Sequence, residues 1–131
     1  MGSRIVRVVN TSRGTALAER CRVASGLADR ARGLLGRRGL AAGEGLYVER
    51  APSIHMFFMR FAIDAVFVDA GGRVVRVVDN LRPWRIVAWV RGASDCVELP
   101  AGSVQLTGTQ VGDVLALEPI DPPQLPNETR A

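Results

Sequence analysis

The sequence contains no lysine, because all 17 of its basic residues are arginine. This absence excludes chemistry that needs a lysine amine, such as a Schiff base, a Ser-Lys dyad or the phosphate-binding lysine of a P-loop. The arginines are scattered and give a net charge of only +4, without a run that interleaves them with the aromatic residues on which single-stranded nucleic acid stacks. The pattern therefore argues against a nucleic-acid partner.

Metal-binding residues are equally scarce. The chain has one histidine, His55, and two cysteines, Cys21 and Cys96. These are too few for the tetrahedral cysteine and histidine sites that hold zinc. The sequence therefore predicts no metal and no cofactor, and in a reducing compartment both thiols are expected to stay free.

Long uncharged hydrophobic segments are also missing. The most apolar stretch, residues 53–69, is interrupted by Arg60 and Asp64, whereas a membrane span needs about 20 consecutive apolar residues. The opening residues, MGSRIVRVV, lead directly into a strand pattern without a signal-peptide region. We therefore expect a cytoplasmic protein with no membrane span.

The length and apolar content that remain are those of one domain, with 131 residues of which 47% are hydrophobic. Alternating patterns predict strands over residues 4–9, 15–23, 46–49, 54–59, 61–68, 73–79, 85–90, 94–99 and 111–117. Helical spacing predicts one main amphipathic helix over 25–36 and a second short helix within 100–108. We expect an α+β domain over 1–118 with a mostly antiparallel, strongly curved or barrel-like sheet, followed by a flexible proline-rich tail over 119–131.

The stretch SIHMFFMRFAIDAVFVD, residues 53–69, holds the only histidine and all four phenylalanines. A segment this apolar is expected to be buried, and a buried charge is costly unless it is paired. His55, Arg60 and Asp64 therefore form either a polar network in the core or the lining of a pocket. We predict that Asp64 is buried and bonded to Arg60, His55 or nearby backbone NH groups.

A second candidate surface is the loop over residues 80–85, which Pro83 makes rigid. Trp84 either offers an aromatic face to a ligand or packs under the loop, and both alternatives are open. The candidate ligand-binding residues are His55, Met59, Arg60, Asp64, Asn80, Trp84, Arg85 and Glu98.

The order of these blocks resembles a known family. The run SIHMFFMRFAIDAVFVDAGGRVVRVVDNLRPWR, then CVELPAGSVQLTGTQVGDVL, preceded by RARGLLGRRGL, is similar to the prokaryotic family called domain of unknown function 192 over residues 4–118. Ala62 departs from the proline usual in that family, and Met56 from a small polar residue. The resemblance implies a strand-rich fold and no particular activity, since the family carries no established reaction. Its pattern maps onto His55, Phe58, Met59, Arg60, Ile63, Asp64, Phe67, Pro83, Glu98, Leu99, Gly102, Gly112 and Asp113.

Two classes of function fit these residues. The first is a non-catalytic accessory module that binds a protein or a small-molecule ligand in a polar pocket around His55, Arg60 and Asp64. The alternative is a small hydrolase-like enzyme using His55 and Asp64, since histidine is the natural general base near neutral pH. The sequence shows no recognisable nucleophile setting, metal cluster or glycine-rich phosphate loop, which favours the binding module over an enzyme.

Overall fold

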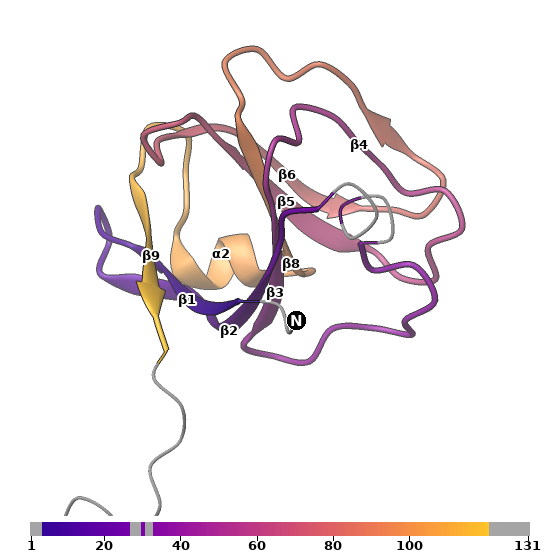
Figure 1. Cartoon of the computed structure of the whole chain (residues 1–131), viewed down its shortest axis with the longest axis horizontal. Helices are drawn as coiled ribbons and strands as arrows, with labels where there is room; N and C mark the ends of the chain where they lie inside the picture. Colours follow the sequence, from indigo (N-terminus) through magenta and orange to yellow (C-terminus); the bar gives the residue numbers. More distant parts are fainter. Residues whose placement is uncertain (1–3, 27–29, 31–32, 121–131) are drawn as a thin grey trace, which may run out of the picture.

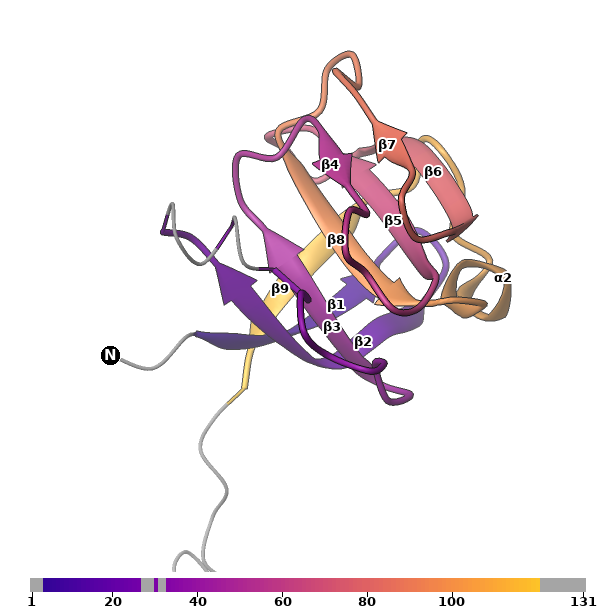
Figure 2. The ribbon, with the colours of Figure 1, turned by 90° about the vertical axis from the view of Figure 1, so that its right-hand side faces the viewer.

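The computed structural model describes residues 4–26, 30 and 33–120, and strands dominate these ranges. Seven strands form one sheet in the order β6-β5-β8-β3-β2-β1-β9, while β4 and β7 form a separate two-stranded ribbon. The large sheet curls strongly into a half-barrel, and the short helix α2 closes one of its ends (Figures 1 and 2). The elements are β1 (Ile5–Asn10), β2 (Thr15–Ala24), β3 (Glu44–Val48), β4 (Ile54–His55), β5 (Ile63–Val68), β6 (Val74–Leu81), β7 (Ile86–Val87), β8 (Asp95–Pro100), α2 (Ser103–Thr107) and β9 (Leu115–Pro119).

The sheet is mixed, because β2 and β3 run parallel while the other neighbouring strands run antiparallel. A parallel pair needs a long crossover connection, and the chain between Ala24 and Glu44 supplies it. The main helix predicted over 25–36 falls in this crossover and lies in part outside the described residues. Within the part that is described, Arg30 is helical and its N–H donates to the Gly26 carbonyl at 2.8 Å. The second short helix, predicted within 100–108, is confirmed as α2.

One predicted strand is wrong over most of its length. The alternation over 54–59 continues only to His55, because the chain turns at Met56. The N–H groups of Met59 and Trp84 both donate to the Met56 carbonyl, and Phe58 adopts a left-handed φ of 64°. The apolar residues that follow His55 therefore face different directions, and Phe58 is left exposed rather than buried.

Two further boundaries differ from the sequence pattern. The strand predicted over 85–90 shortens to β7, and the last strand begins at Leu115 rather than at residue 111. β9 also continues to Pro119, which pairs with Val6 of β1, so the first residue of the predicted tail still belongs to the sheet. Residues 121–131 of that tail lie outside the described part of the chain.

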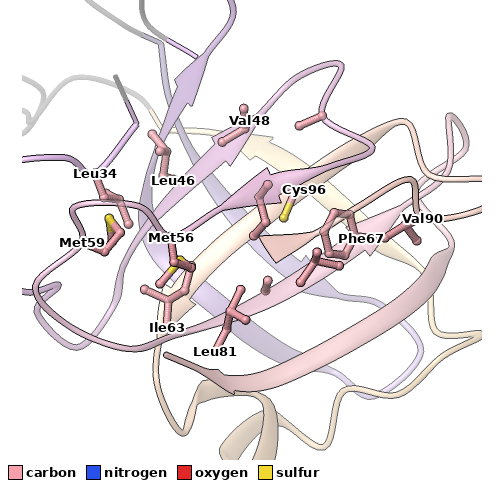
Figure 3. Packing of buried hydrophobic residues seen from close by; sticks show 14 of the residues in the cluster. Leu34, Leu46, Val48, Met56, Met59, Ile63, Phe67, Leu81, Val90 and Cys96 are labelled. Carbon is pink, nitrogen blue, oxygen red and sulfur yellow. The ribbon is translucent and has the colours of Figure 1, made fainter. Parts of the chain in front are cut away.

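Buried apolar side chains form two clusters, divided by the alternation of the strands. On β5, Ala65 and Phe67 belong to one cluster and Val66 and Val68 to the other, so this central strand is buried on both faces. The first cluster lies between the sheet and the chain around the β4–β7 ribbon, where Met56 packs near Ile63 (Figure 3). The second is enclosed by the curl of the sheet itself. The ribbon is thus a cover held over the first cluster.

The turn between β5 and β6 requires glycine at Gly72. Its φ is 88°, and a Cβ at this position would lie 2.5 Å from the Leu115 carbonyl oxygen. The Gly72 N–H donates to the Asp69 carbonyl, as the sequence signal for a hairpin turn predicted. The close approach lets the Leu115 N–H donate to the Gly72 carbonyl at 2.8 Å, which attaches β9 to the turn.

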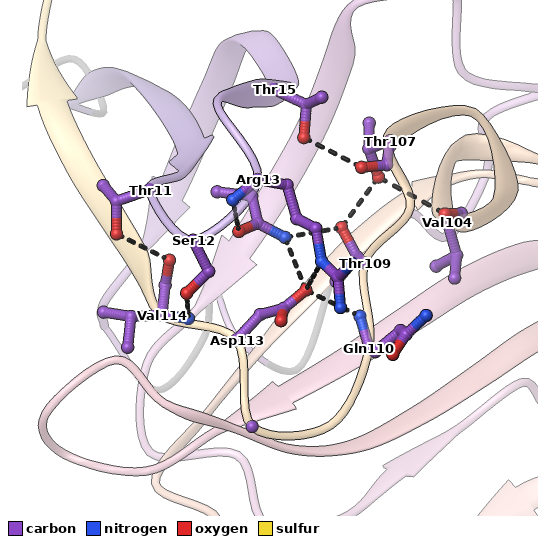
Figure 4. A network of polar contacts seen from close by, with 12 residues as sticks. Thr11, Ser12, Arg13, Thr15, Val104, Thr107, Thr109, Gln110, Asp113 and Val114 are labelled. Atoms are coloured by element: carbon purple, nitrogen blue, oxygen red, sulfur yellow. Dashed lines mark hydrogen bonds and ion pairs between the residues drawn. The ribbon is translucent and has the colours of Figure 1, made fainter.

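A second polar network fixes the start of β9 to the turn between β1 and β2 (Figure 4). The Asp113 carboxylate accepts hydrogen bonds from Arg13 Nε and Asn10 Nδ2, both at 3.0 Å, and from the Gln110 N–H at 2.9 Å. These donors, led by Arg13, lower the pKa of Asp113 to about 2. The carboxylate therefore serves the fold, as its place in a tight turn predicted.

Asp64 is completely buried. Its carboxylate accepts three backbone N–H groups: Asn80 at 2.8 Å, Gly102 at 3.1 Å and Val104 at 2.9 Å. The prediction of a buried Asp64 bonded to backbone NH groups is confirmed, and no hydrogen bond in the described ranges joins it to His55 or Arg60. Asp64 thus ties β5 to the end of β6 and caps the first turn of α2, which has no side-chain cap of its own.

No helix in the described ranges is long and apolar enough to cross a membrane.

Replacing Asp64 with alanine is expected to lower the free energy of unfolding by about 1–3 kcal/mol, because three backbone N–H groups, of which that of Val104 is buried, lose their carboxylate acceptor. Urea unfolding followed by circular dichroism measures the change. Asp79→Ala is the matched control, since Asp79 is an exposed aspartate on β6, next to Asn80. Equal stability of the two variants would contradict the role assigned to Asp64.

Candidate functional site

A cavity of about 330 Å³ opens beside the β4–β7 ribbon. The ribbon and the residues that follow it form one wall, and β3 and the chain after β2 form the rest. Its apolar lining includes Leu34, Val48, Ile54, Met56 and Met59. Its polar lining includes Arg30, Arg50, Ser53, His55 and Glu98. An apolar enclosure with a few polar groups is the usual composition of a small-molecule site.

Glu98 is placed in this cavity by the central strands of the sheet. It sits on β8, opposite Leu46 of β3 and Ala65 of β5. Because side chains alternate along a strand, Glu98 shares its face with Cys96 and points toward the first apolar cluster. Its position on a twice-paired strand holds the carboxylate rigidly at one place in the cavity.

The Glu98 carboxylate has no hydrogen-bond or ion-pair partner within residues 4–26, 30 and 33–120. Burial among apolar side chains raises its pKa from the ordinary 4.5 to about 7. Most buried carboxylates in proteins are paired, and the two buried acids of the described chain, Asp64 and Asp113, follow that rule. Glu98 is half-buried and has no such partner, and a raised carboxyl pKa in a cavity is typical of functional sites.

His55 lies at the rim of the same cavity and is exposed. Its Nδ1 accepts a hydrogen bond from the Phe57 N–H at 3.2 Å, and its ring lies 4.9 Å from the Phe57 ring. The bond to Nδ1 leaves Nε2 available to a ligand.

The two thiols lie in the interior. Cys21 and Cys96 are both buried and both free, as expected. Burial raises the pKa of Cys21 to about 12 and raises that of Cys96 well above its ordinary value. Neither side chain therefore supplies a thiolate nucleophile at neutral pH.

The ribbon also presents apolar side chains to solvent. Phe58, Trp84 and Trp89 are 72%, 58% and 81% exposed, and each has a left-handed φ, of 64°, 71° and 49°. The Trp84 ring lies 4.8 Å from that of Phe58 and 6.0 Å from that of Phe57. The alternative that Trp84 packs under its loop is therefore wrong.

Three of the residues predicted from the sequence come together in the cavity, namely His55, Met59 and Glu98. Asp64 does not join them, because its carboxylate is held in the core by backbone N–H groups. The remaining candidates, Arg60, Asn80, Trp84 and Arg85, are exposed and lie outside the described lining. The pocket expected around His55, Arg60 and Asp64 is thus built instead around Glu98.

The lining also contains residues that the sequence did not single out as site residues. Arg30 and Leu34 follow β2 and Arg50 follows β3, and the approach of these segments to β8 is set only by the tertiary fold. Trp89 is brought to the rim by its N–H, which donates to Ser53 Oγ at 2.7 Å. In the sequence, the one indication of a functional role for Trp89 is that it is a tryptophan close to arginines.

These features define a class: a small domain with a curled, mixed β-sheet and a half-open cavity between the sheet and a covering ribbon. The chain belongs to the family DUF192, described as an uncharacterised ACR, whose model matches residues 8–117. The resemblance stated from the sequence is confirmed.

Several curated relatives carry the name UPF0127 protein. That of Pyrococcus horikoshii is 33% identical over 109 residues, which cover 81% of this chain and 94% of that protein. Those of Thermococcus sibiricus and Pyrococcus furiosus are 38% and 40% identical over 66 and 63 residues, or 50% and 48% of this chain. These two matches span 42% and 53% of the relatives' own lengths, about half of each protein.

Two crystal structures share the fold. One, a protein of Sinorhizobium meliloti proposed to be a transcription regulator, has a TM-score of 0.77 at 22% identity and covers 89% of this chain and 96% of that one. The other, a protein of unknown function from Novosphingobium aromaticivorans, has a TM-score of 0.71 at 25% identity and covers 86% and 83%. The likeness establishes the architecture.

Glu98→Gln is expected to stabilise the fold above about pH 4.5, with the full gain reached above about pH 7. Between the ordinary pKa of 4.5 and the raised value of about 7, the folded protein holds a proton that the unfolded chain has released, so stability falls as pH rises through this window. The penalty is absent below it and complete above it. At about pH 8 the variant should gain about 1–2 kcal/mol, because Glu98 is only half-buried and solvent screens part of the full penalty.

Urea unfolding at several pH values measures this difference. Glu118→Gln, on an exposed carboxylate of β9, is the control and should show no such gain. A Glu98→Gln variant with the same pH dependence as the wild type would show that the carboxylate is already solvated or paired.

A second prediction concerns the left-handed backbone at Trp84. Glycine in a strand is usually less stable than alanine by about 0.5–1 kcal/mol, but a left-handed conformation costs other residues about 1–2 kcal/mol. Trp84→Gly should therefore be at least as stable as Trp84→Ala in thermal unfolding. At Ile86, which is exposed on β7 without a positive φ, the order should reverse. The same order at both positions would disprove the strain at Trp84.

Proposed function

We propose that this protein is a non-catalytic binding module that holds a small molecule in the cavity beside the β4–β7 ribbon. The observation that carries the proposal is the Glu98 carboxylate, which lies in an apolar cavity and has no partner in the described part of the chain. An unpaired carboxylate there is costly when charged. A ligand that donates hydrogen bonds or carries a positive charge would remove that cost, so the site favours such a ligand.

The lining also limits the rest of the ligand. Leu34, Met56 and Met59 offer apolar contacts, and methionine side chains adapt to ligands of irregular shape. A volume of about 330 Å³ is at the small end of ligand pockets. The ligand class that fits beside Glu98 is a small amine with an apolar body, whose amine contacts Glu98 rather than Arg30 or Arg50 of the lining.

The alternative, a hydrolase using His55 and Asp64, is not favoured by this arrangement. Both Asp64 oxygens accept backbone N–H groups, so that carboxylate has no free position from which to orient His55. We also keep the cytoplasm as the location expected from the sequence, and the accessory role requires neither a cofactor nor a metal.

The proposal is tested with hexylamine and hexanoate, which match in chain length and differ in charge. Hexylamine should shift the methyl resonances of Met56 and Met59 in NMR titrations, and its affinity should rise between about pH 6 and pH 8 as Glu98 loses its proton. Hexanoate should bind at least about tenfold more weakly.

Glu98→Gln should weaken hexylamine binding by about tenfold or more, whereas the control Glu118→Gln should bind like the wild type. Equal binding of amine and acid, or unchanged amine binding by Glu98→Gln, would contradict the proposal.

A further inference from the structure

The outer face of the β4–β7 ribbon carries a row of apolar and aromatic side chains, which we call the aromatic strip: His55, Phe57, Phe58, Trp84, Ile86 and Trp89. In the ribbon, Ile54 pairs with Val87 and both point inward, whereas His55 pairs with Ile86 and both point outward. Along the chain, Ile86 of this outward pair lies between Trp84 and Trp89. At one end the Phe57, Phe58 and Trp84 rings pack together, and at the other Trp89 is bonded to Ser53.

The side chains of the strip are much more exposed than apolar side chains that only fill a core. Phe58, Trp84, Ile86 and Trp89 are all more than half exposed. Contiguous apolar patches on proteins mark binding surfaces. Three of these residues also adopt a left-handed backbone, which is unfavourable for large side chains and is found mainly at functional positions. The fold therefore holds these side chains outward at a cost to its own stability.

The charges around the strip have one sign. Residues 53–62 and 82–93, which carry it, contain Arg60, Arg82, Arg85 and Arg91 and neither aspartate nor glutamate. All four arginines are exposed. The ion pairs found in the described ranges join other arginines, on β1, the following turn and the crossover, to carboxylates. The strip is thus an apolar surface with unneutralised guanidinium groups, which is complementary to an anionic partner.

We propose that the aromatic strip binds the surface of membranes that contain anionic lipids. Tryptophan is the side chain that most favours the boundary between lipid tails and headgroups, and arginine pairs with phosphate through its planar fork. The β7–β8 loop that holds Trp89 projects beyond the sheet (Figures 1 and 2), as insertion into a flat surface requires. A helix or span is not needed for such interfacial binding.

The geometry favours lipid over single-stranded nucleic acid. Bases stack on open, parallel ring faces, but the Phe58 and Trp84 rings are tilted by 58° against each other, which covers part of each face. Ile86, in the centre of the strip, offers no stacking surface and is well suited to acyl chains. An acidic peptide would pair with the arginines. It would not, however, bury the projecting apolar side chains of the strip.

Intrinsic fluorescence tests the proposal directly, because Trp84 and Trp89 are the two tryptophans of the chain and both belong to the strip. Vesicles of phosphatidylcholine mixed with phosphatidylglycerol should shift the emission to shorter wavelength and sediment with the protein. Vesicles of phosphatidylcholine alone should bind about tenfold or more weakly, and added salt should weaken binding to the mixed vesicles.

Two variants separate the strip from the rest of the surface. The double variant Arg82→Glu with Arg85→Glu should lose binding to mixed vesicles by about tenfold or more, and Trp89→Ala should also weaken it. The controls are Arg76→Glu on β6 and Leu106→Ala on α2, both exposed and outside the strip, and they should bind like the wild type.

No binding to mixed vesicles, or equal losses in Arg76→Glu and the double variant, would overturn the proposal. A fluorescence shift with a single-stranded oligonucleotide or with polyglutamate, but none with vesicles, would overturn it in favour of those partners. The strip meets the cavity only at its rim, through His55 and Trp89, and Glu98 is not part of the strip. Glu98→Gln should therefore bind vesicles normally even if the hexylamine experiment fails.

Discussion

The architecture depends on one buried carboxylate, that of Asp64. It is placed on the central strand β5 and accepts N–H groups from Asn80 at the end of β6 and from Gly102 and Val104 at the start of α2. The ladder between β5 and β6 is irregular at this point, between Ile63 and Ala65, and the carboxylate joins both strands to α2 there. Because α2 closes one end of the half-barrel and β5 carries both apolar clusters, this interaction fixes the frame on which the cavity is built.

Two acidic residues on neighbouring strands, Asp64 and Glu98, have opposite environments. Asp64 on β5 is saturated with donors, whereas Glu98 on β8 has none in the described chain, although β5 and β8 are directly paired. A carboxylate that served only stability would be expected to resemble Asp64. This contrast within one sheet distinguishes a structural acid from a candidate binding group. The aromatic residues show a similar contrast, because Phe67 is buried in the core whereas Phe58, Trp84 and Trp89 of the strip are exposed.

Much of the fold follows from local sequence pattern, because alternation and turn residues are local signals. The β1–β2 hairpin and the turn at Gly72 are examples. The parallel pairing of β2 and β3 is set by a crossover, which no alternation reveals. The break after His55 arises because Trp84, distant in sequence, donates its N–H to Met56. Likewise, Asp64 and Glu98 are equally plausible site residues in the sequence, and only the tertiary position of backbone donors separates them.

An NMR pH titration of the Glu98 side-chain carboxyl carbon decides whether this carboxylate lies unpaired in a ligand cavity. We expect a midpoint near 7 in the free protein, because burial raises this pKa to about 7, and a lower midpoint once hexylamine is bound. A midpoint at the ordinary value of 4.5, unchanged by the amine, would instead show a carboxylate that is solvated or already paired.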